Sequence, residues 1–415
     1  MAIFTRVADR RNLVACVFTA LSGIFVSAIL HSGSGPNQLY SDIWSFWGRS
    51  WVASGQVPYS SPGAFLEYPP VSGALLYAAR LVGGDLASWF GSTYSGYYGV
   101  FSALSLLAAA GIGWSTWRLA KALGVSLNPL YFILPTMLVY GVYNFDLFNA
   151  LFIVLGLQLF VEKRRNLSAA SIGLAIATKL VAGVLVPIFL LELSGWRQRG
   201  RYLAISAGVA AATFIPVALF NFGYFSQFLS FYSSWGLEDA WYIWIFINQF
   251  STTAKVFGLV LMAVLLLKVY ATKMPLVERS FLALSSYLLA TTIYAPQFNV
   301  MLIPIIAVLG SESAWLYSLE ASNALIILTW FTVPDPTRAW TVPQLFALVR
   351  TASLGLLALT VASHAGHSVT SWLGSHLKLP LGQKGSRCVP GGTSPPSLDD
   401  LITDGGPRKD VVRLE

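Results

Sequence analysis

The sequence predicts an all-α polytopic membrane protein with about twelve transmembrane helices, from its composition, its long uncharged segments and the placement of its basic residues. Apolar residues make up 55% of the 415 residues and charged residues 11%, with a mean hydropathy of +0.64. Soluble domains carry roughly 25% charged residues. Several windows run for about 15 to 20 residues without charge, the length that crosses a bilayer. The net charge of +8 comes from short basic runs between apolar segments, which indicate orientation and not nucleic-acid binding.

The first apolar segment, Leu13 to His31, is predicted to be a retained span. Arg6, Arg10 and Arg11 precede it, as they would in a cleaved signal peptide. The apolar run of about 18 residues is longer than the core of a usual signal peptide. The same arginines place the N-terminus in the cytoplasm, because cytoplasmic loops carry an excess of Lys and Arg.

The other basic runs are predicted to be cytoplasmic and the acidic connections external. The basic runs are Arg118 with Lys121, Lys163-Arg164-Arg165, Arg197 with Arg199 and Arg201, and Lys268 with Lys273 and Arg279. The acidic residues are Asp42, Glu67, Asp85, Asp146, Glu238-Asp239 and Asp335. This pattern predicts an integral protein of the plasma membrane with both termini in the cytoplasm.

Residues 32–93 are predicted to form one long outer loop. An odd number of crossings must separate His31, outside, from Arg118, inside, and residues 94–117 supply one span. A further crossing in residues 69–83 would put Arg118 on the wrong side. The loop is therefore expected to carry its helices on the membrane surface.

Two interfacial helices are expected in this loop. The second, Pro69 to Gly83, is only about 15 residues long, contains Arg80 and begins with prolines, which suit a first helical turn. The first runs from Asp42 to Ser54 through an aromatic stretch, and aromatic residues favour the membrane interface.

The segment Asn166 to Ser194 has two interpretations. Its apolar residues, about 28, are too many for one span and few for two. Lys179 lies at its middle, followed by Gly183 and Pro187. Two short helices that meet near Lys179 satisfy the orientation of the flanking basic runs, and one long tilted helix is the alternative.

The remaining predicted spans complete one transmembrane domain, residues 1–362. These spans are Leu127 to Gly141, Leu147 to Val161, Tyr202 to Phe220, Ser251 to Tyr270, Ser280 to Tyr294, Phe298 to Gly310, Leu319 to Val333 and Val342 to Ala362. Gly, Pro, Ser and charged residues dominate residues 363–415, a composition typical of a disordered tail, here a cytoplasmic one.

Asp42 is the first candidate for chemistry. A carboxylate just outside the first span of such an apolar chain is costly unless it has a function. The alternative is that it caps the helix that follows, because Asp is a good N-cap residue.

Three cations form the second group of candidates: Lys179, Arg350 and Lys255. In the structural interpretation, each of them extends to the membrane interface or pairs with a carboxylate. In the functional interpretation, they contribute to a positive pocket that binds an anionic headgroup through charge-assisted hydrogen bonds. Glu67 and Asp146 have loop or turn roles as alternatives, and Glu238-Asp239 a solvated loop face. The dense aromatic residues between Phe225 and Phe250 suit sugar rings and lipid tails equally.

The sequence contains no motif typical of an ATP-driven protein, a disulfide-rich protein or a metal-binding protein. There is no phosphate-binding Gly-rich loop followed by Lys-Ser or Lys-Thr. The two cysteines, Cys16 and Cys388, and the four histidines give no disulfide framework or metal-ligand spacing. We therefore expect no metal and no cofactor.

Four stretches carry a resemblance to a known class. They are Asp42; Pro58-Tyr59 leading to Glu67-Tyr68-Pro69-Pro70; Ala177-Thr178-Lys179-Leu180 with Pro187; and Ala295-Pro296-Gln297-Phe298 with Pro304. In order, spacing and sidedness the chain resembles the multi-spanning C-type glycosyltransferases over about residues 10–362. It is most similar to glycosyltransferase family 87, the polyprenyl-phosphate-mannose-dependent transferases. Family members often have an aliphatic-Tyr-Pro run after the lysine, where this chain has Leu180-Val181-Ala182.

The resemblance implies an inverting transfer of a hexose, expected to be mannose, on the outer face of the membrane. The class uses the aspartate of the first loop as catalytic base, which carries over to Asp42. The donor is a polyprenyl-phosphate-linked sugar and the acceptor a glycolipid or glycan. We expect Lys179, Arg350 and Lys255 to bind the donor phosphate. The residues expected to bind acceptor and sugar are Glu67, Tyr68, Asp146, Trp44 and Gln297.

The expected chemistry suits these residue types. An acceptor hydroxyl needs a base as it attacks the anomeric carbon, and a lipid-phosphate leaving group needs positive charge and no general acid. The alternative function is a secondary transporter or a flippase of lipids or lipid-linked sugars, in which the ionisable residues would line a pathway. A transporter would place these residues near mid-membrane on several spans, whereas most carboxylates here cluster outside.

Overall fold

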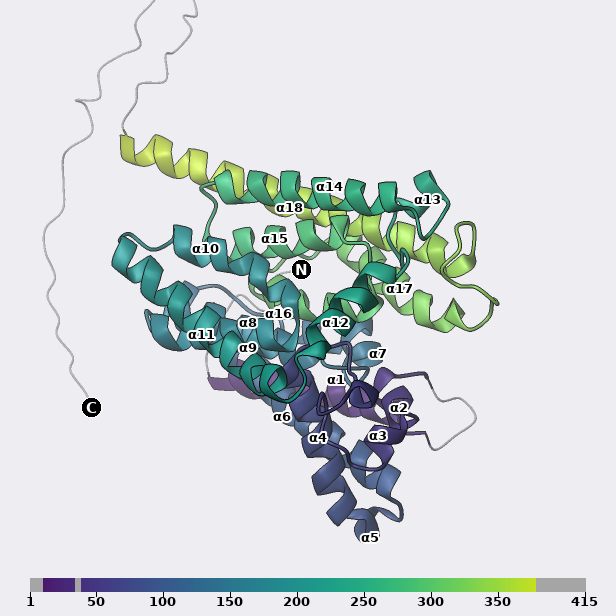
Figure 1. Ribbon diagram of the computed structural model, residues 1–415. Helices are drawn as coiled ribbons and strands as arrows, with labels where there is room; N and C mark the ends of the chain where they lie inside the picture. Colours follow the sequence, from purple (N-terminus) through teal and green to yellow (C-terminus); the bar gives the residue numbers. More distant parts are fainter. Residues whose placement is uncertain (1–9, 34–38, 378–415) are drawn as a thin grey trace, which may run out of the picture. The chain divides into compact units, whose positions relative to one another are not determined.

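The computed structural model describes residues 10–33 and 39–377, with the side chains of residues 11–33 and 39–365. Over the described residues the chain is helical and contains no β-strand beyond one isolated parallel bridge between Glu238 and Ile293. The predicted all-α fold is confirmed (Figure 1). The chain divides into a compact unit of residues 1–370 and a second unit of residues 371–415, of which only the helical residues 371–377 are described.

The first half of the chain contains ten α-helices and three 3-10 helices, within its described residues. They are α1 (Arg10–Leu30), α2 (Asp42–Trp47), α3 (Ser50–Ala53), η1 (Pro62–Ala64), α4 (Pro70–Asp85), α5 (Ala87–Phe90), α6 (Thr93–Leu123), η2 (Pro129–Ile133), α7 (Pro135–Tyr140), α8 (Asp146–Val161), α9 (Arg165–Thr178), η3 (Leu180–Leu185) and α10 (Val186–Leu191).

The second half continues with α11 to α18. These helices are α11 (Trp196–Phe220), α12 (Gly223–Ser234), α13 (Ile243–Phe246), α14 (Thr252–Ala271), α15 (Leu276–Ala290), η4 (Pro296–Met301), α16 (Ile303–Leu309), α17 (Ala314–Trp330) and α18 (Val342–Leu377). The domain boundary predicted at residue 362 falls inside α18. Residues 378–415, most of the predicted tail, lie outside the described residues.

Five helices in the described residues are long and apolar enough to cross a membrane: α1, α6, α11, α14 and α18. Three of the other predicted spans, residues 127–141, 166–194 and 298–310, are interrupted, whereas α8, α15 and α17 are unbroken but have only 15 to 17 residues. Prolines mark several of the breaks: Pro129 and Pro135 lie at the starts of η2 and α7, and Pro296 and Pro304 in the first turns of η4 and α16. Proline lacks the N–H of a helix interior and restricts the residue before it. The integral-membrane class is supported, while the count of about twelve spans stays a prediction.

The segment of residues 166–194 breaks at Lys179. Helix α9 ends at Thr178, and Lys179 takes an extended conformation, with φ −155° and ψ 123°, before η3 begins. The structure therefore has two helical segments that meet at Lys179, and no single continuous helix. The break frees the lysine from the regular helix surface.

Helix α4, predicted as a surface helix, packs against the neighbouring helices. It crosses α6 so closely that a Cβ atom on Gly83 would collide with the backbone of Gly96. The Ser72 hydroxyl donates to the carbonyl of Thr178 at 2.9 Å. Arg80 donates to the carbonyl of Ala53 at 2.9 Å, which explains how an arginine is accommodated in this helix. The position of α4 at a membrane interface stays a prediction.

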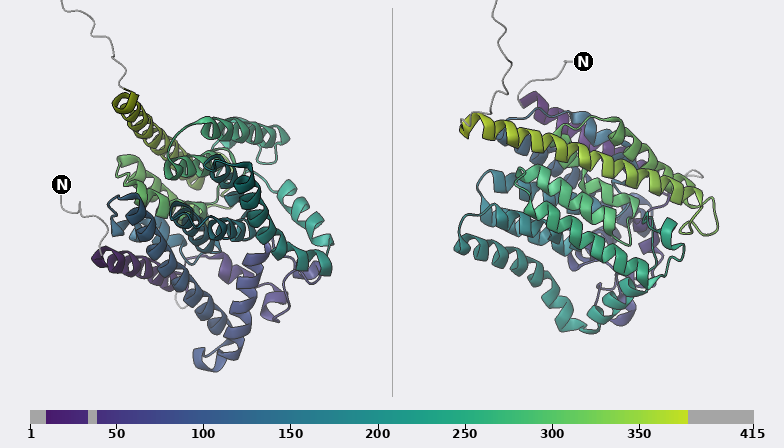
Figure 2. Two further views of the ribbon diagram at one scale, coloured as in Figure 1. Left: turned by 90° about the vertical axis from the view of Figure 1, so that its left-hand side faces the viewer. Right: turned by 90° about the horizontal axis from the view of Figure 1, so that it is seen from above.

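Within residues 1–370, α8 lies at the centre and is buried along most of its length. Helices α14 and α18 lie on one side of it and α4, α5 and α6 on the other (Figures 1 and 2). The first loop and the segment from α12 to α13 meet at one end of this bundle (Figure 1). That end carries the candidate site.

Candidate functional site

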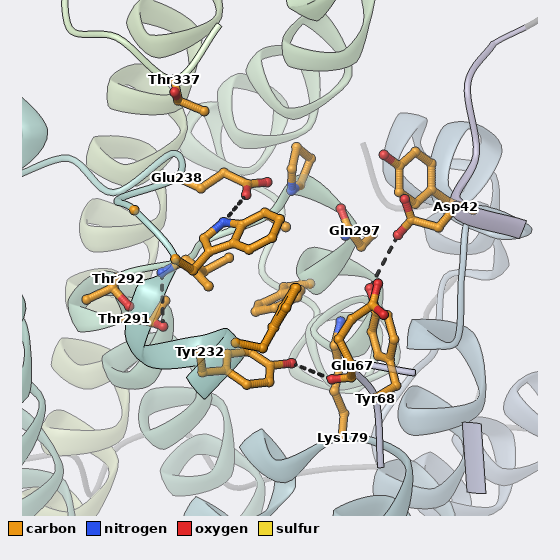
Figure 3. A pocket seen from close by; sticks show the side chains of 18 of the residues that line it. Asp42, Glu67, Tyr68, Lys179, Tyr232, Glu238, Thr291, Thr292, Gln297 and Thr337 are labelled. Carbon is orange, nitrogen blue, oxygen red and sulfur yellow. Dashed lines mark hydrogen bonds between the residues drawn. The ribbon is translucent and has the colours of Figure 1, made fainter. Parts of the chain in front are cut away.

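A cavity of about 960 Å³ lies between the first loop, the segment around α12 and the chain after α15 (Figure 3). Five of the nine site residues predicted from the sequence line it: Asp42, Glu67, Tyr68, Lys179 and Gln297. They come from three distant parts of the sequence. The volume is near the upper end of the usual range for small-molecule sites.

Asp42 is the first residue of α2, but Ser41 is the N-cap. The hydroxyl of Ser41 accepts from the backbone N–H of Trp44 at 3.2 Å. The capping role considered for Asp42 therefore belongs to Ser41. The carboxylate of Asp42 remains available to the cavity.

Two neutral side chains orient the Asp42 carboxylate. The Tyr68 hydroxyl donates to Oδ2 at 3.3 Å, and Asn144 Nδ2 donates to the same oxygen at 3.2 Å. The Asn144 Oδ1 atom accepts from the backbone N–H of Asp146 at 3.0 Å, so the amide is fixed by the start of α8. Asn144 thus ties the base candidate to the central helix.

Burial raises the pKa of Asp42 to about 6. The hydrogen bond from Asn144 opposes this increase, and the nearby charge of Glu67 adds to it. Desolvation disfavours the charged form of a carboxyl group. A carboxylate with a pKa close to the operating pH is well suited to accept a proton.

Glu67 is held by an arginine of the same loop. Arg49 Nη1 and Nη2 each donate to one oxygen of Glu67 at 2.7 Å, in the bidentate geometry that makes such pairs specific. The guanidinium also lies 4.8 Å from the ring centroid of Phe46. The hydroxyl of Tyr232 donates to the backbone carbonyl of Glu67 at 2.9 Å, which joins α12 to the first loop.

Lys179 and Asp146 form an ion pair. Lys179 Nζ lies 2.6 Å from Oδ1 and 2.7 Å from Oδ2 of Asp146. The ammonium also lies 3.7 Å from the ring centroid of Phe298, a cation–π contact. Lys179 lines the cavity, whereas Asp146 does not.

The far wall of the cavity, across from Asp42 in Figure 3, carries Glu238. Trp235 Nε1 donates to Oε2 of Glu238 at 2.8 Å. Burial, with a smaller contribution from Asp239, raises the pKa of Glu238 to about 7. Gln297 also faces the cavity, and its buried Oε1 has no hydrogen-bond partner among the described residues.

Four predicted site residues do not line the cavity: Asp146, already described, and Arg350, Lys255 and Trp44. Arg350 is fully buried and donates to the carbonyls of Tyr294, at 2.6 Å, and Asp239, at 3.3 Å. Lys255 donates to the carbonyl of Ser233 at 2.6 Å. Trp44, on α2, is 48% exposed and is not part of the lining.

Sequence reasoning did not single out Arg49, Asn144 or Tyr232 as site residues. Arg49 had a usable signal, because an arginine in a predicted outer loop departs from the positive-inside pattern. Asn144 and Tyr232 lay in stretches already noted for other reasons, and only the fold brings them to the cavity. Within the described residues, no group of three or more His, Cys, Asp or Glu side chains is placed to hold a metal ion.

The sequence matches glycosyltransferase family 87 over residues 65–250. This confirms the predicted resemblance over that part of the chain, which includes Glu67, Asn144, Lys179 and Glu238. A solved structure, ArnT from Cupriavidus metallidurans bound to undecaprenyl phosphate, is similar with a TM-score of 0.43 and 14% identity, over 87% of this chain and 79% of that chain. A search of curated proteins found no match. The family match and the apolar helices support a membrane glycosyltransferase.

Proposed function

We propose that this chain, with its family 87 region, transfers a hexose from a polyprenyl-phosphate donor to a glycolipid or glycan acceptor on the outer face of the membrane. The expected hexose is mannose, as the resemblance implies. The observation that carries the proposal is the carboxylate of Asp42. It faces a cavity of about 960 Å³ and is oriented by Tyr68 and Asn144.

In the proposed reaction Asp42 accepts the proton of the acceptor hydroxyl as that oxygen attacks the anomeric carbon of the donor sugar. The bond from that carbon to the phosphate oxygen breaks, and polyprenyl phosphate leaves with the electron pair. One displacement inverts the configuration and requires no enzymatic nucleophile. Because the leaving group is an anion already, no general acid is needed.

We assign the leaving phosphate to Lys179. An ammonium group has three N–H donors, and two of them are directed at Asp146, which leaves one for a phosphate oxygen. In this arrangement Asp146 positions the lysine and does not touch the sugar. A charge-assisted contact of this type stabilises the developing charge in the transition state.

We assign the sugar hydroxyls to the polar groups around Asp42. Gln297 has an unpaired Oε1 atom at the cavity, which would otherwise be a buried polar atom without compensation. Glu67 presents its carboxylate beside Arg49, and Tyr68 reaches Asp42 directly. Together they surround the site where the acceptor oxygen and the anomeric carbon must meet.

The test is a transfer assay with membranes that contain the chain. We expect radiolabelled polyprenyl-phosphate-mannose to yield label in a new glycolipid or glycan, and membranes that contain Asp42→Asn protein at the same level to yield almost none. Donors that carry glucose or galactose identify the sugar. If correctly inserted protein transfers label from none of these donors, the proposed function is wrong.

A further inference from the structure

The wall of the cavity opposite Asp42 carries a carboxylate that the proposed reaction does not use. Glu238 lies in the connection between α12 and α13, and Figure 3 places it across the cavity from Asp42 and Lys179. Trp235 Nε1 donates to Oε2 of Glu238 at 2.8 Å. No other hydrogen bond within the described residues reaches this carboxylate, so Oε1 can accept from a ligand hydroxyl.

The backbone holds Glu238 rigidly. Its N–H donates to the carbonyl of Thr292 at 3.0 Å, and its carbonyl accepts from the N–H of Tyr294 at 2.9 Å. The buried guanidinium of Arg350 donates to the carbonyls of Asp239 and Tyr294, one on each side of this pairing. A carboxylate placed by such a framework is preorganised, because little conformational freedom remains to be lost on binding.

The charges around the cavity indicate which ligand group this wall accepts. The two cations in the lining are Arg49 and Lys179, and both pair with carboxylates at the Asp42 side. Around Glu238 the lining is neutral and polar, with Thr292, Thr337 and Gln249. A second anion would be repelled there, whereas hydroxyl groups would donate to the carboxylate.

Trp235 supplies the complementary apolar surface. Its side chain is 41% exposed and lines the cavity. A sugar ring has an apolar face and hydroxyl groups around its edge. An aromatic side chain can pack against the apolar face, and a carboxylate can accept hydrogen bonds from the hydroxyl groups. A polyprenyl chain would use the ring but has no group for Glu238.

We propose that Glu238 and Trp235 form a subsite for the sugar ring of a saccharide acceptor. The assignment to the acceptor rests on the proposed function, because the sugar of the donor is joined to a phosphate that belongs at the cationic side of the cavity. Glu238 determines specificity for saccharide acceptors over other alcohols.

The first arm of the test measures binding without chemistry. The full chain is placed in phosphatidylcholine nanodiscs free of sugar detergents, and saturation-transfer NMR follows binding of methyl α-mannoside and octyl α-mannoside. Loss of a charge-assisted hydrogen bond predicts about tenfold weaker binding to Glu238→Gln, and Trp235→Phe also weakens it. The control Glu312→Gln, outside the cavity lining, retains binding.

The second arm separates acceptor from donor with labelled polyprenyl-phosphate-mannose. We expect Glu238→Gln to raise the KM for octyl α-mannoside about tenfold and to leave donor hydrolysis to free mannose unchanged. An equal loss of hydrolysis and transfer overturns the assignment to the acceptor. Saccharide binding that is absent, or that Glu238→Gln does not change, overturns the subsite itself. Binding that depends on Glu238 without transfer from any donor keeps the subsite and contradicts the proposed function instead.

Discussion

Lys179 and Asp146 form an ion pair in which the lysine Nζ atom lies 2.6 and 2.7 Å from the two carboxylate oxygens. The pair joins the break between α9 and η3 to the first residue of α8. Lys179 is 8% exposed and Asp146 1% exposed, so neither charge is well solvated. The stability of the fold therefore depends on this ion pair, and so does the donor-phosphate contact that we propose for Lys179.

Separate replacements should distinguish these two roles. Asp146→Asn leaves the lysine unpaired in the protein interior and should lower the free energy of unfolding by about 3–5 kcal/mol. Lys179→Met leaves the carboxylate unpaired and should be similarly costly. The double variant should recover stability in thermal unfolding and remain inactive in donor-limited transfer assays. Recovery of transfer in the double variant would remove Lys179 from the phosphate site.

Replacement of Arg350 should show whether this residue stabilises the fold or binds the donor phosphate. Its hydrogen bonds to the carbonyls of Tyr294 and Asp239 predict that Arg350→Met mainly destabilises the protein, by about 1–3 kcal/mol for each buried acceptor left unpaired. Thermal unfolding and a donor titration measure the two effects. A raised KM for the donor with unchanged unfolding would instead place Arg350 at the donor phosphate, the role expected from the sequence.

The pH dependence of transfer should report the pKa of Asp42. Burial raises this pKa to about 6, and the base works only when deprotonated, so the rate should increase through pH 6 to a plateau. At pH 5 the rate should be about tenfold below the plateau, because about a tenth of the base is then ionised. A rate that is independent of pH between 5 and 7 would contradict this assignment.

Two variants should shift the acidic limb of the pH–rate profile, the part where the rate increases with pH, in opposite directions. The Asn144 hydrogen bond favours the carboxylate and the Glu67 charge disfavours it. Asn144→Ala should therefore shift the limb to higher pH and Glu67→Gln to lower pH. Complete pH–rate profiles at saturating donor measure both shifts, and shifts of the same sign would show that another group controls the profile.

The predicted outer loop can be tested by labelling. Cysteine substitutions at Ser61 and Ser88, in a background without Cys16 and Cys388, should both react with an impermeant thiol reagent added from outside. Ser88 is exposed beyond the end of α4, so its reaction reports the side that α4 reaches. Labelling of Ser88→Cys only after permeabilisation would mean that α4 crosses the membrane.

The helices were largely predictable from the sequence, because apolar periodicity and proline positions are local signals. Residues 69–83 contain the expected helix as α4, whereas residues 42–54 form two short helices, α2 and α3, in place of the one predicted. The break at Lys179 agrees with one of the two interpretations of residues 166–194. The number of spans was less predictable, since short helical pieces such as η2 with α7 have the composition of a span without its continuous length.

The partners of the site residues could not be predicted. Tyr68 is 26 positions and Asn144 102 positions from Asp42 in the sequence, and only the tertiary fold brings both side chains to this carboxylate. The partners of Arg350 could not be predicted either. A buried arginine has the same sequence signature whether it binds a phosphate or backbone carbonyls.

Transfer by the Asp42→Asn variant tests the central claim most directly. The substitution keeps the size of the side chain and leaves the Ser41 cap intact, but an amide cannot accept the proton. General-base catalysis contributes about 10²–10⁴-fold, so the variant should fold and bind donor normally and lose nearly all transfer of labelled mannose. Transfer above about a tenth of the wild-type rate, in protein with unchanged unfolding, would contradict the assignment of Asp42 as the base.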